Sequence, residues 1–460
     1  MSRYEQRLAW VHPIAACLVL GTLMGGCSEL QERAPRSPYD ATEKPPAPQT
    51  SPPTSGTPSA ATPPAAPQSV APAVQPPPPP AAAAAPPPAP TPPPILPYDQ
   101  ALLSAATAAL ANAKLPPDGS PVQAKYTVVI DPLIDGMTGA QSSTTRSMGA
   151  RLSVMMREQY PQYDVQPFSA TTVAKHPLVL IGTFTGVNAQ RKTEGKREAY
   201  RICFALVDLK SGKVVSKGLA FAYPDGVDPT PLAFYRDAPA WTEDPATVGY
   251  IKTCQGTKAG DPINALYIDR ILAAALIAEA IDAYDAGRYD AALDLYAAAL
   301  RTPGGEQFRV YNGIYLASWK LDRRDEAEAA FGELVDYGLK QKRLAVKFLF
   351  RPGSTAFWPD PQVSGPYPVW LKTIAAQAAA DNVCLEVIGH TSATGPEPLN
   401  ERLSLLRAEY IRSRLTKITP ALEKRTIANG MGSKQALVGN GRDDATDALD
   451  RRVEFAVINC

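Results

Sequence analysis

Proline is the feature that most limits what this chain can fold into. Of its 48 prolines, 25 lie in the 63 residues from 35 to 97, mixed with Ala, Ser, Thr and Gln. Such a stretch holds too few bulky apolar residues to offset the entropy lost on folding. In a polyproline conformation it would reach at most about 200 Å. We therefore expect residues 27–98 to be a disordered tether rather than a ligand for proline-binding domains, with the folded domains after it.

The N-terminus has the pattern of an export signal. Arg3 and Arg7 precede an apolar run at 14–24, which is too short for a comfortable membrane span. The sequence LMGGCS that follows, at 23–28, resembles a bacterial lipobox, with Met where Leu is commonest. The resemblance implies a signal peptide at 1–26, a lipid on Cys27 and, from Ser28, sorting to the outer membrane. Cys17 fits the local pattern but leaves almost no apolar run before it. Ordinary secretion or an uncleaved anchor would also fit the N-terminal pattern.

Residues 99–258 have the pattern of an α/β domain. Apolar and β-branched runs predict strands, and a periodic apolar stripe predicts one helix, at 144–160. The predicted strands are 124–130, 164–168, 177–182, 200–209 and 213–221. The element order and the motifs LIGTF (180–184) and DLKSG (208–212) resemble periplasmic lipoprotein domains of the CsgG and LpoB type. That resemblance implies a part in secretion assemblies or in activating peptidoglycan synthases, without catalysis.

Residues 262–342 are predicted to be helical and contain an internal repeat. AGRYDAALDLY at 286–296 matches LDRRDEAEAAF at 321–331 with an offset of 35. The spacing resembles tetratricopeptide repeats, although two units are fewer than independent stability usually needs. A further helix is predicted at 268–284 from its apolar periodicity. The region is either a partner-binding groove or a packing spacer between two domains.

Residues 344–460 have the pattern of a small α/β sandwich. Strands are predicted at 346–350, 385–390 and 451–458, and helices at 369–379 and 400–415. The motifs GHTSATG (389–395), GMG (430–432) and DRRVE (450–454), with Asn400 and Arg407 between them, closely resemble the OmpA-like C-terminal domain. The resemblance covers about 115 residues and implies non-covalent binding of peptidoglycan.

The same resemblance implies which residues bind the stem peptide of peptidoglycan. Arg407 matches the arginine that engages a carboxylate, for which a guanidinium fork is well suited. Thr391 and Asn400 match two further positions on the ligand side. Ser392 stands where the family has the Asp that engages the amino group of diaminopimelate.

The serine has consequences for the predicted affinity. Hydrogen bonds to charged groups contribute roughly 1.5–3 kcal/mol, and hydrogen bonds between neutral groups roughly 0.5–1.5 kcal/mol. Serine in place of aspartate is therefore expected to weaken the binding of an ammonium several-fold or more. Three acidic residues are candidates to supply the missing charge: Glu397, Asp443 and Asp444. The alternative is that this fold serves protein contacts instead. A Ser392 nucleophile with His390 as base is the weakest hypothesis, because no GxSxG elbow and no orienting acid accompany them.

The cysteines fit an exported protein. Once the signal peptide and Cys27 are set aside, four remain, and three pairings are possible. We predict disulfides Cys203–Cys254 and Cys384–Cys460, the second joining the start of one strand to the end of the last. The sequence has no CxxC motif and no histidine cluster, so we expect no zinc site and no cofactor.

Taken together, these features predict an outer-membrane lipoprotein that faces the periplasm and binds the peptidoglycan of the cell wall. The net charge of +1 argues against a nucleic-acid partner. We expect no enzyme activity. The alternative is a regulator in which residues 101–342 bind a wall synthase or secretion machine and the C-terminal domain binds peptidoglycan weakly.

Overall fold

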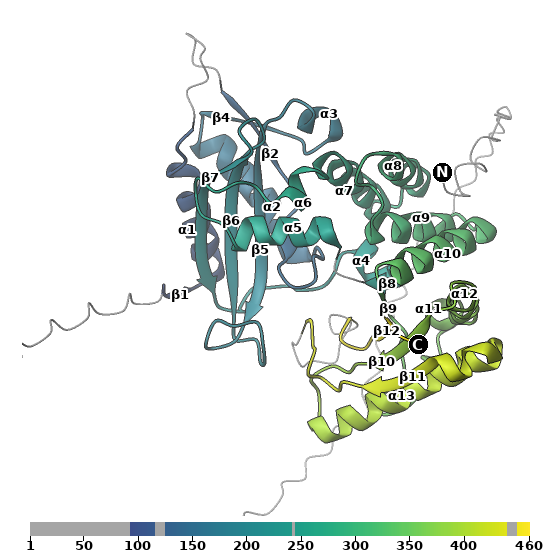
Figure 1. Cartoon of the computed structure of the whole chain (residues 1–460). Helices are drawn as coiled ribbons and strands as arrows, with labels where there is room; N and C mark the ends of the chain where they lie inside the picture. Colours follow the sequence, from purple (N-terminus) through teal and green to yellow (C-terminus); the bar gives the residue numbers. More distant parts are fainter. Residues whose placement is uncertain (1–92, 116–124, 242–243, 439–448) are drawn as a thin grey trace, which may run out of the picture. The chain divides into compact units, whose positions relative to one another are not determined.

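The computed structural model of the chain describes residues 93–115, 125–241, 244–438 and 449–460 (Figure 1). The predicted signal peptide, Cys27 and most of the tether lie outside them. The tether ends earlier than predicted, because Ile95–Leu96 already form strand β1, which pairs with β7. Within the part of the chain that the structure describes, no helix combines the length and apolar character that crossing a membrane requires.

A seven-stranded sheet forms the first folded region, in the order β1-β7-β6-β5-β2-β4 with β3 beside β5. Its antiparallel core is the hairpin β6–β7 and its neighbour β5, whereas β2, β3 and β4 pair in parallel. The predicted strands are all present. The strands are β1, β2 (Tyr126–Ile130), β3 (Ile134–Asp135), β4 (Tyr163–Gln166), β5 (Leu178–Val187), β6 (Ala199–Asp208) and β7 (Lys213–Ala222).

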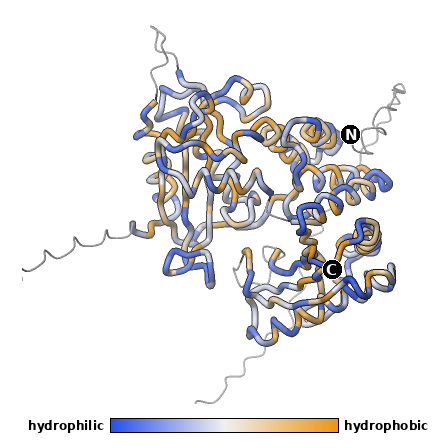
Figure 2. Tube along the Cα trace, in the orientation of Figure 1, coloured by the Kyte–Doolittle hydropathy of each residue, from blue (hydrophilic) through white to orange (hydrophobic). Residues whose placement is uncertain are grey.

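Helices cover both faces of this sheet, so its central strand β5 is buried throughout. Side chains of α1 (Tyr98–Ala111) and α2 (Ser143–Gln159) form one core with the strands. Those of α5 (Pro245–Gln255), α6 (Ala265–Ile268) and α7 (Ile271–Asp285) form the other. Apolar stretches of the chain are drawn in orange in Figure 2. Two short helices, α3 (Ala170–Val173) and α4 (Ala233–Asp237), lie in the connections.

Four helices follow in succession, and each packs on the next. They are α7, α8 (Tyr289–Arg301), α9 (Phe308–Lys320) and α10 (Arg324–Lys340). The helix predicted at 268–284 is interrupted, because the chain turns between α6 and α7.

The repeat offset of 35 is visible in the backbone of this region. Gly287 after α7 and Asp322 after α9 both have a positive φ, of 73° and 60°. The next residue in each case, Arg288 or Arg323, donates its N–H to the carbonyl five residues back. This is the hydrogen bond of a Schellman helix end. The two motifs therefore build the same helix-to-helix turn.

A five-stranded sheet forms the C-terminal region, in the order β11-β10-β12-β9-β8. Its last strand, β8 (Ala240–Trp241), comes from a segment about a hundred residues earlier and pairs with β9 (Arg343–Val346). The buried Asn312 side chain of α9 bonds both the N–H and the carbonyl of Ala240, which satisfies the free edge of β8. The other elements are α11 (Pro361–Ser364), α12 (Tyr367–Ala380), β10 (Cys384–Gly389), α13 (Glu397–Ile418), a 3₁₀ turn at Pro420–Arg425, β11 (Thr426–Gly430) and β12 (Val453–Ile458).

The strand predicted at 346–350 is wrong in its position, since β9 ends at Val346. The backbone turns there, with the N–H of Phe348 bonded to the carbonyl of Val346. The Lys347 side chain lies outside the sheet, and its ammonium donates hydrogen bonds to the carbonyls of Tyr235 and Arg236 at the end of α4. A cation there satisfies orphan carbonyls of the helix end, which the apolar pattern of 346–350 does not reveal.

Glycine permits the close approach of α13 to β10, and a matched pair of substitutions tests it. A Cβ on Gly389 would overlap the carbonyl oxygen of Ser404, whereas a Cβ on Gly149 in α2 would meet nothing. We expect Gly389→Ala to lower the free energy of unfolding by about 2 kcal/mol or more through overpacking. Gly149→Ala should raise it by about 0.5–1 kcal/mol through helix propensity. Chemical denaturation measures both; equal effects of the two would contradict the packing described.

Candidate functional site

A cleft of about 530 Å³ opens beside the N-terminal half of α13. All four residues predicted to bind a ligand line it together: Thr391, Ser392, Asn400 and Arg407. They come from the loop after β10 and from α13, which folds back over the sheet. The cleft is the candidate functional site.

The loop after β10 is fixed by backbone hydrogen bonds at its start. The N–H of His390 donates to the carbonyl of Arg452, and the N–H of Thr391 to that of Gly432. Thr391 and Ser392 are consequently buried, with 3% and 4% of their surface exposed. The Ser392 hydroxyl lies 3.0 Å from that of Thr394. The cleft therefore presents a group of hydroxyls at this end.

Helix α13 supplies the other two residues. Asn400 and Arg407 are seven positions apart and thus share one face of the helix. The Arg407 guanidinium donates from Nε to the carbonyl of Ser354 at 3.1 Å, and from Nη2 to that of Arg351 at 3.2 Å. It also lies over the Phe350 ring, 4.9 Å from its centroid. These contacts hold the guanidinium plane at the cleft wall and limit its conformational freedom.

Sequence reasoning missed several residues of the cleft. Arg451 lines it, although its DRRVE motif was noted without a role for this residue. One wall is apolar, and Trp358 and Phe350 belong to it. Both come from the segment between β9 and α12, which no local pattern connects with α13. The aromatic-rich composition of 348–358 is the one sequence feature that could have pointed there.

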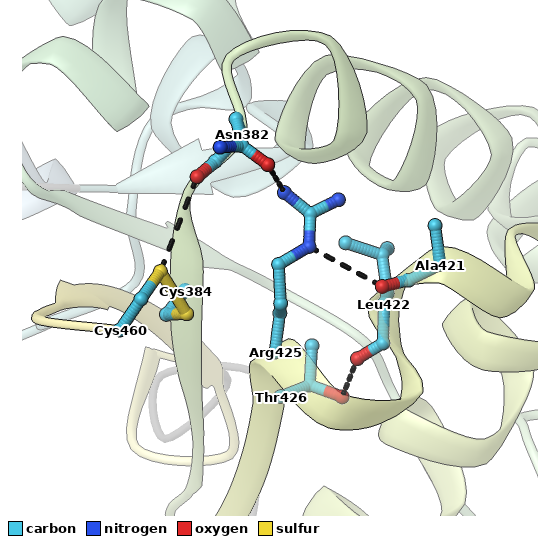
Figure 3. Close-up of a disulfide and its surroundings, with 7 residues drawn as sticks. All are labelled: Asn382, Cys384, Ala421, Leu422, Arg425, Thr426 and Cys460. Carbon is cyan, nitrogen blue, oxygen red and sulfur yellow. Dashed lines mark hydrogen bonds between the residues drawn. A yellow bond between two sulfur atoms is a disulfide. The ribbon is translucent and has the colours of Figure 1, made fainter.

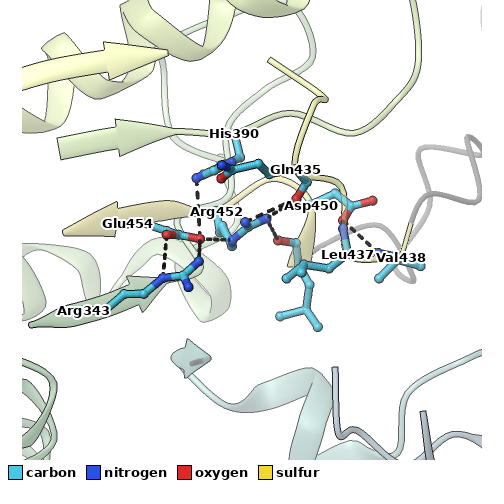
Figure 4. A network of polar contacts seen from close by, with 9 residues as sticks. Arg343, His390, Gln435, Leu437, Val438, Asp450, Arg452 and Glu454 are labelled. Atoms are coloured by element: carbon cyan, nitrogen blue, oxygen red, sulfur yellow. Dashed lines mark hydrogen bonds and ion pairs between the residues drawn. The ribbon is translucent and has the colours of Figure 1, made fainter. Parts of the chain in front are cut away.

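A buried polar network includes His390 and Arg452, which are next in sequence to Thr391 and Arg451 of the cleft (Figure 4). Glu454 accepts two hydrogen bonds from Arg343 and one of 2.7 Å from Arg452. Burial works to raise the pKa of Glu454, but the two arginines hold it below its usual range. The His390 Nε2 atom is 3.5 Å from this carboxylate. Neither ring nitrogen of His390 has a hydrogen-bond partner among the described residues, so the structure shows no hydrogen bond from Ser392 to His390 that would support it as a base.

His390 predicts a pH dependence of stability. Burial, with the Arg452 cation, lowers the pKa of His390 from 6.5 to about 3. Between these values the unfolded chain binds a proton that the folded chain does not, so stability is lost as the pH falls below 6.5. Between pH 6.5 and 4 we expect the wild type to lose roughly 3 kcal/mol more than His390→Asn. Urea unfolding across this range measures it. His176→Asn, at an exposed histidine, is the control, and a His390→Asn variant with an unchanged pH profile would contradict the assignment.

One of the three candidates for the missing carboxylate is engaged elsewhere. Glu397, at the start of α13, accepts from the N–H and the hydroxyl of Ser433. It connects the helix to the segment after β11 and is absent from the lining of the cleft. Asp443 and Asp444 lie outside the described residues.

Comparison with known proteins identifies the region that holds the cleft. The family model described as "OmpA family" matches residues 349–448. The chain carries an OmpA-like domain at its C-terminus. The outer membrane porin F of Pseudomonas fluorescens is 37% identical over 89 residues, or 19% of this chain. The chain spans about a quarter of the length of that relative, 26%.

Three solved structures are each similar to about a quarter of this chain. The peptidoglycan-associated lipoprotein from Burkholderia pseudomallei has 22% identity and a TM-score of 0.21, covering 25% of this chain and 89% of that one. The cell wall anchor of the T6SS from Pseudomonas aeruginosa has 22% identity and a TM-score of 0.21, covering 26% and 81%. An outer membrane protein from Borrelia burgdorferi has 24% identity and a TM-score of 0.20, covering 25% and 88%.

The OmpA-like domain contains a disulfide, Cys384–Cys460 (Figure 3). It joins the first residue of β10 to the end of the chain just beyond β12, as predicted. Beside it, Arg425 donates to the Asn382 side chain at 2.5 Å and to the carbonyl of Ala421. The disulfide and Arg425 together hold the loop before β10 against its neighbours.

The second predicted disulfide is wrong: Cys203 and Cys254 are thiols. They do lie side by side, because α5 crosses β6 at this point, and their sulfurs are 2.8 Å apart. Each thiol also reaches the backbone carbonyl of the other residue. Burial raises the pKa of the Cys254 thiol well above its ordinary value. The hydrogen bond from Cys254 lowers the pKa of the Cys203 thiol, so the thiolate that disulfide exchange requires is favoured at Cys203.

Proposed function

We propose that the protein is an outer-membrane lipoprotein whose OmpA-like domain binds peptidoglycan without a covalent bond. The chain would then link the outer membrane to the cell wall from the periplasmic side. Lipid on Cys27 would fix one end, and the proline-rich segment would span the distance. No catalytic role is assigned to any residue of the cleft.

One observation carries the proposal. Four residues identified by their resemblance to the OmpA-like motif line a single cleft, and the arginine among them is buried and oriented. A guanidinium held in this way suits a carboxylate, which the stem peptides of peptidoglycan carry. The OmpA family match covers every residue of this cleft except Arg451, and the relative from Pseudomonas fluorescens is named as an outer membrane porin.

Co-sedimentation with isolated sacculi tests the binding. The full-length chain, kept in detergent, should pellet with intact sacculi and remain in the supernatant after the sacculi are digested with a muramidase. Pelleting that is equal with and without sacculi would contradict the proposal. Point variants are preferable to deleting 344–460, because the deletion would remove most of β9, with which β8 pairs. It would also remove Trp370, which contacts Tyr315 and Phe331 of the helical region.

Metabolic labelling with a radioactive fatty acid tests the anchor. The wild type and Cys17→Ser should incorporate the label, and Cys27→Ser should not. Equal labelling of Cys27→Ser would place the lipid elsewhere and contradict the anchor proposed here.

Partner binding by residues 101–342 is the second candidate. A cleft of about 650 Å³ beside the helical region, lined by Arg270, Arg301 and Tyr337, favours it. The contacts of Tyr315 and Phe331 with Trp370 favour a packing role instead. A chain that pellets with sacculi only when other envelope proteins are present would support the partner-binding function.

A further inference from the structure

The backbone between β9 and α12 folds into a narrow hairpin that forms one wall of the cleft. The N–H of Arg351 donates to the carbonyl of Ala356, and the N–H of Trp358 donates to the carbonyl of Leu349, each at 2.9 Å. The Arg407 side chain of α13 donates to two carbonyls in the turn of this hairpin. The hairpin is therefore held both within itself and to the helix that supplies another wall of the cleft.

Trp358 is the exposed aromatic residue of this hairpin. Its neighbour Phe357 packs on the rings of Phe348 and Phe350, with centroids 5.8 and 5.3 Å apart. Adjacent residues of an extended segment point to opposite faces, and Trp358 is 37% exposed. Its ring stacks on no other aromatic ring among the described residues. An indole has an apolar face and one N–H donor, so it suits a ligand that is apolar on its face and polar at its edge.

Exposure divides the cleft into a polar interior and an apolar mouth. Trp358 and Leu399, which is 64% exposed, define the mouth. The four residues predicted to bind the stem peptide are at most 6% exposed and lie in the interior. A ligand that occupies both parts is polar where it enters deepest and covers apolar surface where it leaves the cleft.

We propose that the mouth of the cleft binds the sugar that carries the stem peptide, with the Trp358 ring against one face of the pyranose. This role of Trp358 rests on the proposed function and extends the ligand from the peptide to the glycan strand. In peptidoglycan each stem peptide is attached to an N-acetylmuramic acid residue, so a peptide in the interior brings a sugar to the mouth. A pyranose has C–H groups on its face and hydroxyls at its edge. The indole face would cover the C–H groups, and its N–H would donate to a hydroxyl or to the acetamido carbonyl.

Two synthetic probes test the sugar contact. One is N-acetylmuramoyl-L-Ala-γ-D-Glu-meso-diaminopimelate, and the other has a lactoyl group on the same tripeptide, so that the two differ in the sugar ring alone. Titration calorimetry with the full-length chain should show the muramoyl probe binding about fivefold more tightly. Trp358→Ala should bind the muramoyl probe as weakly as the lactoyl probe, and its affinity for the lactoyl probe should stay close to that of the wild type.

Two further variants serve as controls. Leu406→Ala removes a leucine of α13 that is 41% exposed and does not line the cleft, and it should keep the wild-type ratio of the two affinities. Trp358→Phe keeps an aromatic face but loses the N–H, so it should retain part of that ratio. The ratio is measured within each variant, because an effect on folding would weaken the binding of both probes and leave their ratio unchanged.

The outcomes separate the sugar contact from the proposed function. If the wild type pellets with sacculi but binds the two probes equally, the sugar contact is wrong and the function stands. The contact is also wrong if Trp358→Ala keeps the wild-type ratio, or if Leu406→Ala loses it. If the wild type pellets but binds neither probe, the sugar contact is wrong as well. If it neither pellets nor binds a probe, both proposals fail.

Discussion

Replacing Arg407 by alanine should lower the affinity of the full-length chain for sacculi by about tenfold or more. A paired guanidinium contributes at least two charge-assisted hydrogen bonds to a carboxylate, and each is worth roughly 1.5–3 kcal/mol. The Arg407 side chain also holds the segment 351–354 through two carbonyls. The variant should therefore lose both the proposed ligand contact and part of the cleft wall. A sedimentation isotherm over a range of sacculus concentrations measures the change.

Two controls separate binding from folding in this experiment. Arg402→Ala removes an exposed arginine of the same helix that does not line the cleft, and it should bind like the wild type. Arg407→Lys keeps the charge but loses the fork, so its affinity should fall between the other two. Thermal unfolding of each variant confirms that the domain is folded. Equal binding by folded Arg407→Ala and the wild type would remove Arg407 from the site.

Removing the disulfide Cys384–Cys460 is the second large effect. The bond joins two residues separated by 76 positions and closes a segment that contains β10, α13, β11 and β12. On chain-entropy grounds its loss should lower the free energy of unfolding of the OmpA-like domain by roughly 4 kcal/mol. The double variant Cys384→Ala, Cys460→Ala should therefore unfold at a clearly lower denaturant concentration. Unfolding in urea, followed by tryptophan fluorescence, to which Trp358 and Trp370 of this domain contribute, measures it.

Reductant provides the matched comparison for the disulfide. Reducing the wild type should lower its stability toward that of the double variant, and the double variant should be indifferent to reductant. A wild type whose unfolding is unaffected by complete reduction would contradict a stabilising role for this bond. Mass spectrometry of the alkylated thiols establishes that reduction is complete.

The site was predictable from the sequence because its parts are close along the chain. Thr391, Ser392, Asn400 and Arg407 lie within one loop and the helix that follows. Helical geometry alone places Asn400 and Arg407 on one face. The motif that resembles the OmpA-like domain therefore named residues that the fold indeed brings together. Their role in binding stays a prediction.

The rest of the cleft depends on tertiary packing. Phe350 and Trp358 approach α13 only because the backbone turns at Lys347 and leaves the sheet. Strand β8 has two residues, too few for any periodic pattern, and only its pairing with β9 reveals it. The strand at Ile95–Leu96 is likewise too short to be distinguished from the tether. Local patterns carry no information about such pairings.

The two cysteine pairs show the same limit. The last strand and the start of β10 are antiparallel neighbours, so the proximity of Cys384 and Cys460 follows from the strand order. The proximity of Cys203 and Cys254 was also predicted correctly. Whether two adjacent sulfurs are bonded depends on their redox state and thiolate population, which no residue pattern contains.

Competition on intact sacculi tests whether the cleft of the OmpA-like domain binds peptidoglycan. The full-length chain is bound to sacculi at half saturation, and a soluble stem peptide is added in increasing amounts. We expect saturable binding, release of the chain by the peptide, and no release by a peptide of the same length whose carboxylates are amidated. A chain that stays in the supernatant with sacculi, or that stays bound at every peptide concentration, would contradict peptidoglycan binding by this cleft.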